Sequence, residues 1–172
     1  MKQLKLINPE NVSGEEVKNY KVREATRAVV FDEEGKIVLL HVIKENYYKL
    51  PGGGVEETED KMISLRRECQ EEIGCDIDVI GEIGSIVEYR KIFNLKQISY
   101  CYLAKIKGQK GTPNFTEDEK NNGFEQVWLP YNEALKVLTK TKATSIEGSA
   151  YIVPRDTIFL EEAKKYLANL NK

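Results

Sequence analysis

Glu68, Glu71 and Glu72 are the residues of this chain best suited to chemistry, because their spacing brings them together on a helix. At about 100° per residue, an α-helix places positions i, i+3 and i+4 within an arc of roughly 100°. Like charges at this spacing repel one another and destabilise an isolated helix. A hard divalent cation such as Mg²⁺, which binds carboxylate, water and phosphate oxygens, would relieve that repulsion. We therefore expect these three side chains to bind a metal ion.

The residues around these carboxylates predict a helix that is entered from a glycine-rich loop. Apolar side chains on one stripe predict a buried face, and Glu72 borders that face. The stripe consists of Met62, Leu65, Cys69 and Ile73. We expect Thr58 to be the N-cap, residues 59–60 to occupy the first turn, and Gly74 to end the helix. The glycine run at residues 51–54 would let backbone groups approach a ligand closely.

Residues 53–75 as a whole resemble the Nudix box, G-x5-E-x7-R-E-U-x-E-E-x-G-U, in which U is a bulky apolar residue. The matching residues are Gly53, Glu59, Arg67, Glu68, Cys69, Glu71, Glu72, Gly74 and Cys75. Cysteine at both U positions is a mild departure, since a buried cysteine behaves as a small hydrophobe. The resemblance implies a Nudix hydrolase with an α/β/α sandwich fold built on a mixed β-sheet.

The resemblance also implies a reaction, the hydrolysis of a nucleoside diphosphate linked to another moiety, assisted by Mg²⁺ or Mn²⁺. The implied metal ligands are Glu68, Glu71, Glu72 and the Gly53 carbonyl. Arg67 would orient a carboxylate, and Glu59 would lie behind the ligands. We expect Glu71 or Glu72 to be the general base that activates water. The competing candidates for a base or further ligand lie in the polar segment 112–126, and they are Glu117, Asp118, Glu119 and Glu125.

Substrate contacts are expected from three neighbouring parts of the chain. Arg27, on the first predicted core strand, could contact a phosphate or merely cover the sheet. Tyr47 and Tyr48 alternate across a short strand, so only one can face the site, and we choose Tyr48 for stacking on a base. Core packing is the alternative role for both tyrosines. Gly52 and Gly54 complete the predicted substrate-binding set.

The chain lacks two marks that the Nudix resemblance associates with particular substrates. ADP-ribose hydrolases usually carry a proline about fifteen residues after the box, whereas Tyr89, Arg90 and Lys91 stand here. A SQPWPFP-like segment of the NADH type is missing as well. These absences favour nucleoside triphosphates, oxidised or non-standard ones included, cleaved to a monophosphate and pyrophosphate.

Several other functions stay open at this stage. One is the hydrolysis of nucleotide sugars or dinucleotides, and another is a non-catalytic module that senses nucleotides. Isoprenoid isomerases share the fold, but the additional cysteine and the histidine pattern that they use cannot be placed in this chain.

Composition limits the partners and the compartment. The 26 basic and 28 acidic residues nearly balance, so we do not expect nucleic acid to be the main partner. The expected partner is a small nucleotide substrate. Apolar runs are shorter than the 18 or so residues of a membrane span, and no signal peptide is recognisable. Cys69, Cys75 and Cys101 have neither the number for a disulfide framework nor the spacing of a zinc site. We predict a cytoplasmic protein without a membrane partner.

Hydrophobic periodicity predicts an α+β protein in which strands outnumber helices. Strands are expected at residues 25–31, 36–43, 47–50, 76–87, 98–106 and 124–129, and further helices at residues 130–138 and 154–170. We assign residues 23–172 to one Nudix hydrolase domain and residues 1–22 to an N-terminal extension. The extension, with an edge strand at residues 4–7, would pack on the domain or on the second subunit of a homodimer.

Overall fold

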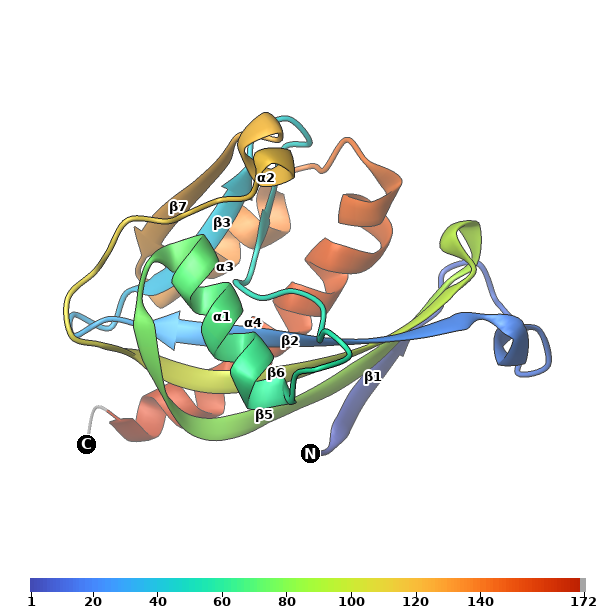
Figure 1. The fold of residues 1–172 in the computed structure, drawn as a ribbon, viewed down its shortest axis with the longest axis horizontal. Helices are drawn as coiled ribbons and strands as arrows, with labels where there is room; N and C mark the ends of the chain where they lie inside the picture. The colour runs from blue at the N-terminus through green and yellow to red at the C-terminus, as the bar shows by residue number, and fades with distance from the viewer. Residues whose placement is uncertain (171–172) are drawn as a thin grey trace.

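The computed structural model describes residues 1–170, which form a seven-stranded mixed sheet with helices on both faces (Figure 1). The strand order is β1-β5-β6-β2-β3-β4, and β7 pairs with β3 outside this path. The strands are β1 (Gln3–Ile7), β2 (Lys21–Phe31), β3 (Ile37–Val42), β4 (Tyr47–Lys49), β5 (Asp76–Arg90), β6 (Leu95–Lys107) and β7 (Phe124–Leu129). β1 runs parallel to β5, and β2 runs parallel to β6. The predicted α+β fold with a mixed sheet is confirmed.

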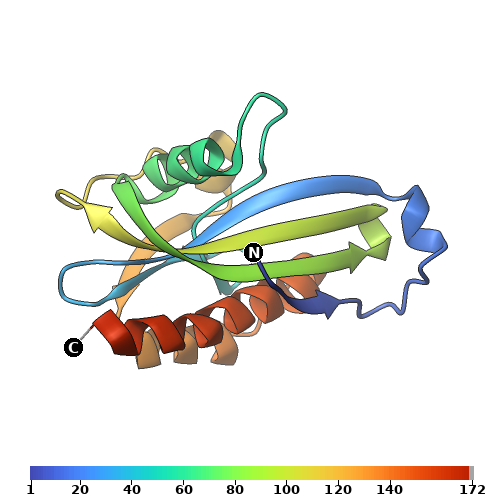
Figure 2. The same cartoon turned by 90° about the horizontal axis from the view of Figure 1, so that it is seen from below.

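Helices cover both faces of the sheet (Figure 2), and a hydrophobic core fills the space between each face and its helices. α1 (Lys61–Ile73) covers one face, and α3 (Tyr131–Lys140) and α4 (Val153–Leu170) cover the other. Because successive strand residues point to opposite faces, β2 and β3 supply both cores. Val29 and Leu39 pack on the side of α3 and α4, whereas Val30 and Val38 pack on the side of α1. The result is the three-layer sandwich that the resemblance implies.

Several elements are longer than the sequence predicts, because strand pairing continues through polar residues. β2 begins at Lys21 rather than at residue 25, since its parallel ladder with β6 continues to the pair Lys21 and Leu95. The polar segment 112–126, for which no helix was predicted, contains the short helix α2 (Glu117–Asn121), which begins with a capping box formed by Thr116 and Glu119. Three short turns, η1 (Glu16–Asn19), η2 (Lys91–Phe93) and η3 (Gly148–Ile152), complete the described elements.

The start of α1 differs from the prediction. Asp60 is the N-cap in place of Thr58, and its carboxylate accepts hydrogen bonds from the backbone N–H groups of Met62 and Ile63 at 2.8 and 2.9 Å. Because the backbone of Asp60 is extended and its side chain caps the helix, Glu59 precedes the first turn, and Arg67 holds the Glu59 carboxylate. The predicted end of the helix at Gly74 is confirmed.

The N-terminal segment joins the sheet through the predicted edge strand, β1. After β1, the chain passes through η1, and Val12, Val17 and Tyr20 form a small cluster against Tyr89. The boundary at residue 22 and the second subunit of a homodimer stay predictions.

The glycine run is held against the central strand by backbone hydrogen bonds. β2 and β3 pair at Phe31 and Ile37 and then diverge (Figure 1). Residues 51–55 run beside β2 instead, where the N–H of Thr26 donates to the Gly53 carbonyl at 2.9 Å and the N–H of Ala28 donates to the Pro51 carbonyl at 3.1 Å. This attachment fixes the loop that leads into α1.

Gly52 is required for this attachment, and its replacement gives a test. Its φ of +129° disfavours other residues, and a Cβ there would overlap the Thr26 carbonyl oxygen. We predict that Gly52→Ala lowers the free energy of unfolding, measured by urea denaturation, by about 1–3 kcal/mol. Gly14→Ala is the control, because nothing lies within 4 Å of a Cβ added at Gly14. Equal stability of the two variants would contradict the tight contact between the loop and β2.

Candidate active site

A cavity of about 300 Å³ lies where α1, the glycine run, β4 and α4 meet. Its walls come from both layers of helices, with Glu68 and Glu72 on α1 and Arg155 on α4. The divergence of β2 from β3 lets residues from the two faces of the sheet reach one space. Charged side chains dominate the lining, and they are Glu68, Glu72, Glu119, Glu147, Arg23, Arg27, Lys49 and Arg155.

Glu72 is the most deeply buried carboxylate of this cavity, with 1% of its surface exposed. Its Oε1 accepts a hydrogen bond from Lys49 Nζ at 2.7 Å, and its Oε2 accepts one from the Gly52 N–H at 2.6 Å. Burial, with a smaller contribution from the negative charge of Glu68, raises the pKa of Glu72 to about 7, against the opposing effects of Lys49 and the Gly52 N–H. The site therefore contains a carboxylate that titrates near neutral pH.

Glu68 lies directly against the backbone of the glycine run. A Cβ at residue 53 would overlap its carboxylate, which explains why a glycine stands there. The Gly53 carbonyl is turned toward β2, where it accepts the hydrogen bond from Thr26. Backbone and carboxylate thus meet at the wall of the cavity without an intervening side chain.

Arg67 connects the outer carboxylates of α1. Its Nε and Nη2 donate to the two oxygens of Glu59 at 2.6 and 3.0 Å, which is the strong bidentate arrangement. Its Nη1 donates to Glu68 at 2.9 Å and to Glu71 at 3.2 Å, and its Nη2 donates to the Gly54 carbonyl at 3.3 Å. The hydrogen bond with Arg67 lowers the pKa of Glu59. One cation therefore holds three of the four box glutamates in place.

Not every predicted residue reaches the cavity. Glu71 faces Arg67 with 36% of its side chain exposed, and it is not part of the lining. Among the four acidic candidates of segment 112–126, Glu119 lines the cavity. Glu117 and Asp118 are exposed on α2, and Glu125 is exposed on β7, paired with His41 of β3.

The aromatic residue at the cavity differs from the chosen one. Tyr48 stacks on the His41 ring at 4.3 Å between centroids and packs against the core beneath α3. Tyr47 and Phe124 line the cavity instead. Lys49 shares the cavity side with Tyr47, as the two-residue period of a strand requires, and that period was the signal from which Lys49 could have been found.

The structure adds two further residues that local patterns could not reveal. Arg155 on α4 and Glu147 before η3 lie about a hundred residues after the glycine run in sequence, yet they line the same cavity. Both lie outside the box, and no spacing within their own segments marks them.

The predicted metal site is only partly assembled in this arrangement. Within residues 1–170, no group of three or more His, Cys, Asp or Glu side chains is placed to hold a metal ion. Arg67 engages Glu71, and Lys49 supplies the positive charge beside Glu72. The carboxylate oxygens of Glu68 and Glu72 nevertheless line one cavity, and oxygen donors fit a hard cation. A Mg²⁺ or Mn²⁺ site stays a prediction, with these two residues at its centre.

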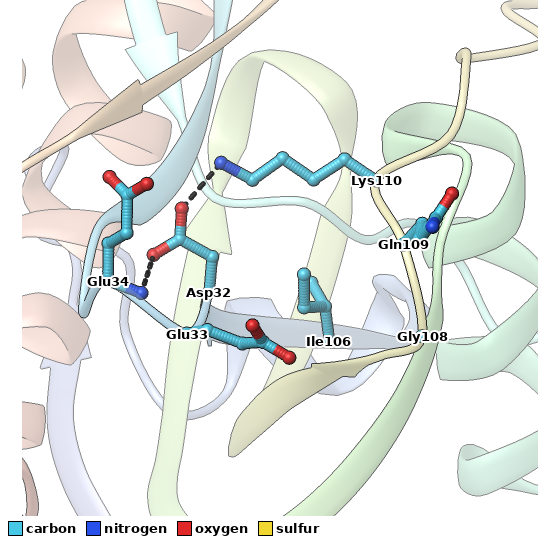
Figure 3. Close-up of a pocket in the computed structure, with 7 residues that line it drawn as sticks. All are labelled: Asp32, Glu33, Glu34, Ile106, Gly108, Gln109 and Lys110. Carbon is cyan, nitrogen blue, oxygen red and sulfur yellow. Dashed lines mark hydrogen bonds and ion pairs between the residues drawn. The ribbon is translucent and has the colours of Figure 1, made fainter.

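A second cavity, of about 330 Å³, lies between the β2–β3 turn and the end of β6 (Figure 3). Asp32 there binds Lys110 and accepts a hydrogen bond from the Glu34 N–H, and Lys110 also lies over the Trp128 ring at 4.2 Å. This cavity contains none of the predicted site residues, so we assign the chemistry to the first cavity.

Comparison of the chain with known protein families identifies its family. The NUDIX domain family matches residues 21–149. The chain belongs to the Nudix family. This membership confirms the Nudix resemblance of residues 53–75. The helices of residues 1–170 lack the combination of length and apolar character that crossing a membrane would require.

Similar proteins include one sequence relative and several solved Nudix structures. An RNA pyrophosphohydrolase of Pelagibacter ubique (strain HTCC1062) is 26% identical over 95 residues, which is 54% of this chain and 59% of that protein. The chain thus matches less than two thirds of that relative's length. A Nudix hydrolase from Nitrosomonas europaea has a TM-score of 0.65 at 14% identity, over 85% of this chain and 90% of its own. A MutT protein from Methanosarcina mazei Go1 has a TM-score of 0.58 at 16% identity, and the match covers 89% of this chain and 97% of that protein. At these identities, the two structures establish the fold.

The raised pKa of Glu72 predicts how the stability of the metal-free protein depends on pH. Because folding raises the pKa of Glu72, its protonated carboxyl group contributes fully to stability at pH values below 4.5, the pKa of the unfolded state. That contribution is lost as the pH rises through the folded-state pKa of about 7. We expect the wild type to lose about 3 kcal/mol of unfolding free energy relative to Glu72→Gln over this range. Urea denaturation with EDTA at a series of pH values measures the difference.

Glu133→Gln, which removes an exposed carboxylate from α3, is the control for this comparison. Parallel stability profiles of the wild type and Glu72→Gln would contradict the raised pKa.

Proposed function

We propose that this Nudix protein is a Mg²⁺- or Mn²⁺-dependent pyrophosphohydrolase that cleaves a nucleoside diphosphate linked to another moiety. Nucleoside triphosphates, including oxidised or non-standard ones, are the favoured substrates, and a monophosphate and pyrophosphate are the products. The observation that carries the proposal is a cavity in which two carboxylates of one helix, the buried Glu72 and its neighbour Glu68, meet four cationic side chains. Phosphoryl oxygens are the natural partners of such cations.

Glu72 is the residue to which we assign the general base. A base works best when its pKa lies near the operating pH, and in the metal-free protein burial raises the pKa of Glu72 into that range. A bound cation would lower this pKa and favour the ionised carboxylate, which is the form that accepts a proton. Lys49 and the Gly52 N–H hold its two oxygens, which fixes the direction in which the carboxylate can accept a proton from water. Glu119 on α2, which also lines the cavity, is the competing candidate.

The metal ligands that we propose are Glu68, Glu72 and Glu71. When bound, a divalent cation would neutralise phosphoryl oxygens and make a water molecule more nucleophilic. Arg67 positions Glu68 through its 2.9 Å hydrogen bond. Its contact with Glu71 is longer, at 3.2 Å, and that half-exposed carboxylate is the least constrained of the three.

The remaining walls of the cavity would bind the substrate. Arg23, Arg27 and Lys49 offer positive charge to its phosphates, and the glycines at residues 52–54 leave room beside them. Tyr47 and Phe124 are the aromatic surfaces on the cavity, so a nucleobase would meet them rather than Tyr48. We place this activity in the cytoplasm, in keeping with three cysteines that are buried and unbonded.

A substrate panel tests the proposal directly. Purified protein with Mg²⁺ or Mn²⁺ should release a monophosphate and pyrophosphate from at least one nucleoside triphosphate, resolved by ion-exchange chromatography. The panel should also contain nucleotide sugars, dinucleotides and RNA with a 5′-triphosphate, the last because the sequence relative is named an RNA pyrophosphohydrolase. Reaction in ¹⁸O-labelled water identifies the phosphorus that is attacked. No product from any member would refute the hydrolase, and binding without turnover would favour the nucleotide sensor.

Glu72→Gln gives the matching test of mechanism. We predict that kcat falls at least about 10²-fold, the scale of a lost general base, while the circular dichroism spectrum is unchanged. Glu133→Gln on the exposed surface of α3 should keep wild-type turnover. A Glu72→Gln variant that turns over at the wild-type rate would transfer the role of base to another residue.

A further inference from the structure

Two buried arginines face the cavity on the side opposite the box carboxylates. Arg27 comes from β2 and Arg155 from α4, and 6% and 1% of their surfaces are exposed. The Nε of Arg27 and both Nη atoms of Arg155 are buried, yet they make no hydrogen bond to any described residue. Buried donors almost always have a partner, so these three nitrogens indicate a ligand.

Arg155 is held so that its forked end stays available. Its Nε donates to Asp156 Oδ1 at 2.7 Å, and Asp156 Oδ2 in turn accepts a hydrogen bond from the Leu50 N–H at 2.9 Å. Its Nη1 lies 3.7 Å from Glu88 Oε2, which is near enough for an ion pair and too far for a hydrogen bond. The guanidinium is therefore hydrogen-bonded through Nε and lies beside Glu88, while Nη1 and Nη2 keep hydrogens that an anion could accept.

The two guanidiniums also repel each other. Burial, and to a lesser extent the positive charge of Arg155, lowers the pKa of Arg27 to about 10, against the opposing negative charges of Asp156, Glu72 and Glu68. Arg27 has one hydrogen bond, from Nη1 to the Thr26 carbonyl, which carries no full negative charge. An anion bound between the arginines would remove the repulsion and supply acceptors to the three nitrogens.

We propose that Arg27 and Arg155 form an anion subsite that holds the terminal phosphate of the substrate. This inference rests on the proposed function and names its substrate class. A nucleoside triphosphate ends in a free phosphate, whose oxygens match the forked donors of arginine. A nucleotide sugar or a dinucleotide would instead bring uncharged hydroxyl groups or a second nucleoside to this wall. The subsite therefore selects substrates with a free phosphate end over diphosphates that are capped on both sides.

Calorimetry with inorganic pyrophosphate tests the subsite without relying on turnover. Wild-type protein should bind pyrophosphate, and Arg27→Met and Arg155→Met should each weaken that binding at least about tenfold, the effect of losing charged hydrogen bonds. Arg66→Met is the matched control, because Arg66 is an exposed arginine on α1 outside the cavity, and its affinity should equal that of the wild type. Circular dichroism checks the fold of each variant.

Arg155→Met removes the cation that pairs with the buried Asp156 and could unfold the protein, so a second variant keeps the charge. Arg155→Lys keeps the charge but loses the forked donors, and it should also bind pyrophosphate more weakly than the wild type. Wild-type affinity in both Arg27→Met and Arg155→Lys would overturn the subsite. Weaker pyrophosphate binding by the variants would support the anion subsite even if the protein hydrolysed no substrate. The calorimetry therefore separates failure of the subsite from failure of the proposed hydrolysis.

Selectivity gives the second readout. The ratio of kcat/KM for a nucleoside triphosphate to that for a nucleotide sugar with the same base should fall at least about tenfold in Arg27→Met. An unchanged ratio, with both substrates slowed equally, would overturn the assignment of the terminal phosphate to this wall.

Discussion

The attachment of the glycine run to β2 is the constraint on which the rest of the site depends. β2 pairs with β3 at a single register position, Phe31 and Ile37, and residues 51–55 take the place beside β2 through backbone hydrogen bonds. This places the Gly52 N–H against Glu72 and leaves the space at Gly53 that Glu68 fills. Two carboxylates of one helix can then enter the cavity together, although their charges repel. The remainder of α1 packs through apolar side chains, such as Leu65 and Cys69, that any buried helix could supply.

Buried charges inside the protein are mostly paired, and two departures from full pairing, at Glu72 and at Arg155, lie at the cavity of the proposed chemistry. Arg67 is shared by three carboxylates, and Arg155 is paired with Asp156. Glu72 has a cationic partner in Lys49 but is buried deeply enough that its pKa still rises. Local conflicts of this kind are costly for a fold and are typically kept where they serve a function. The unsatisfied guanidinium nitrogens at the opposite wall belong to the same class.

Sequence patterns predicted the structural features that depend on residues close together in the chain. The position of α1, its end at Gly74 and the buried edge at Glu72 all follow from helical spacing, and the mixed sheet follows from alternating apolar runs. The helical wheel could not predict that Glu71 turns to Arg67, because a wheel fixes the direction of Cβ and not the partner of the carboxylate. The alternation of Tyr47 and Tyr48 was clear, but which of them faces the cavity depends on where β4 sits. Arg155 reaches the site through packing between segments about a hundred residues apart, for which a single sequence contains no signal.

A crystal structure with Mn²⁺ and a non-hydrolysable nucleoside triphosphate analogue would test the central claim most directly. The claim is that one cavity gathers a cation on α1 and a phosphate chain between α1 and α4. The anomalous signal of manganese should lie beside the carboxylates of Glu68 and Glu72, with the phosphates extending toward Arg155. Manganese and nucleotide bound elsewhere, with this cavity unchanged, would contradict the account.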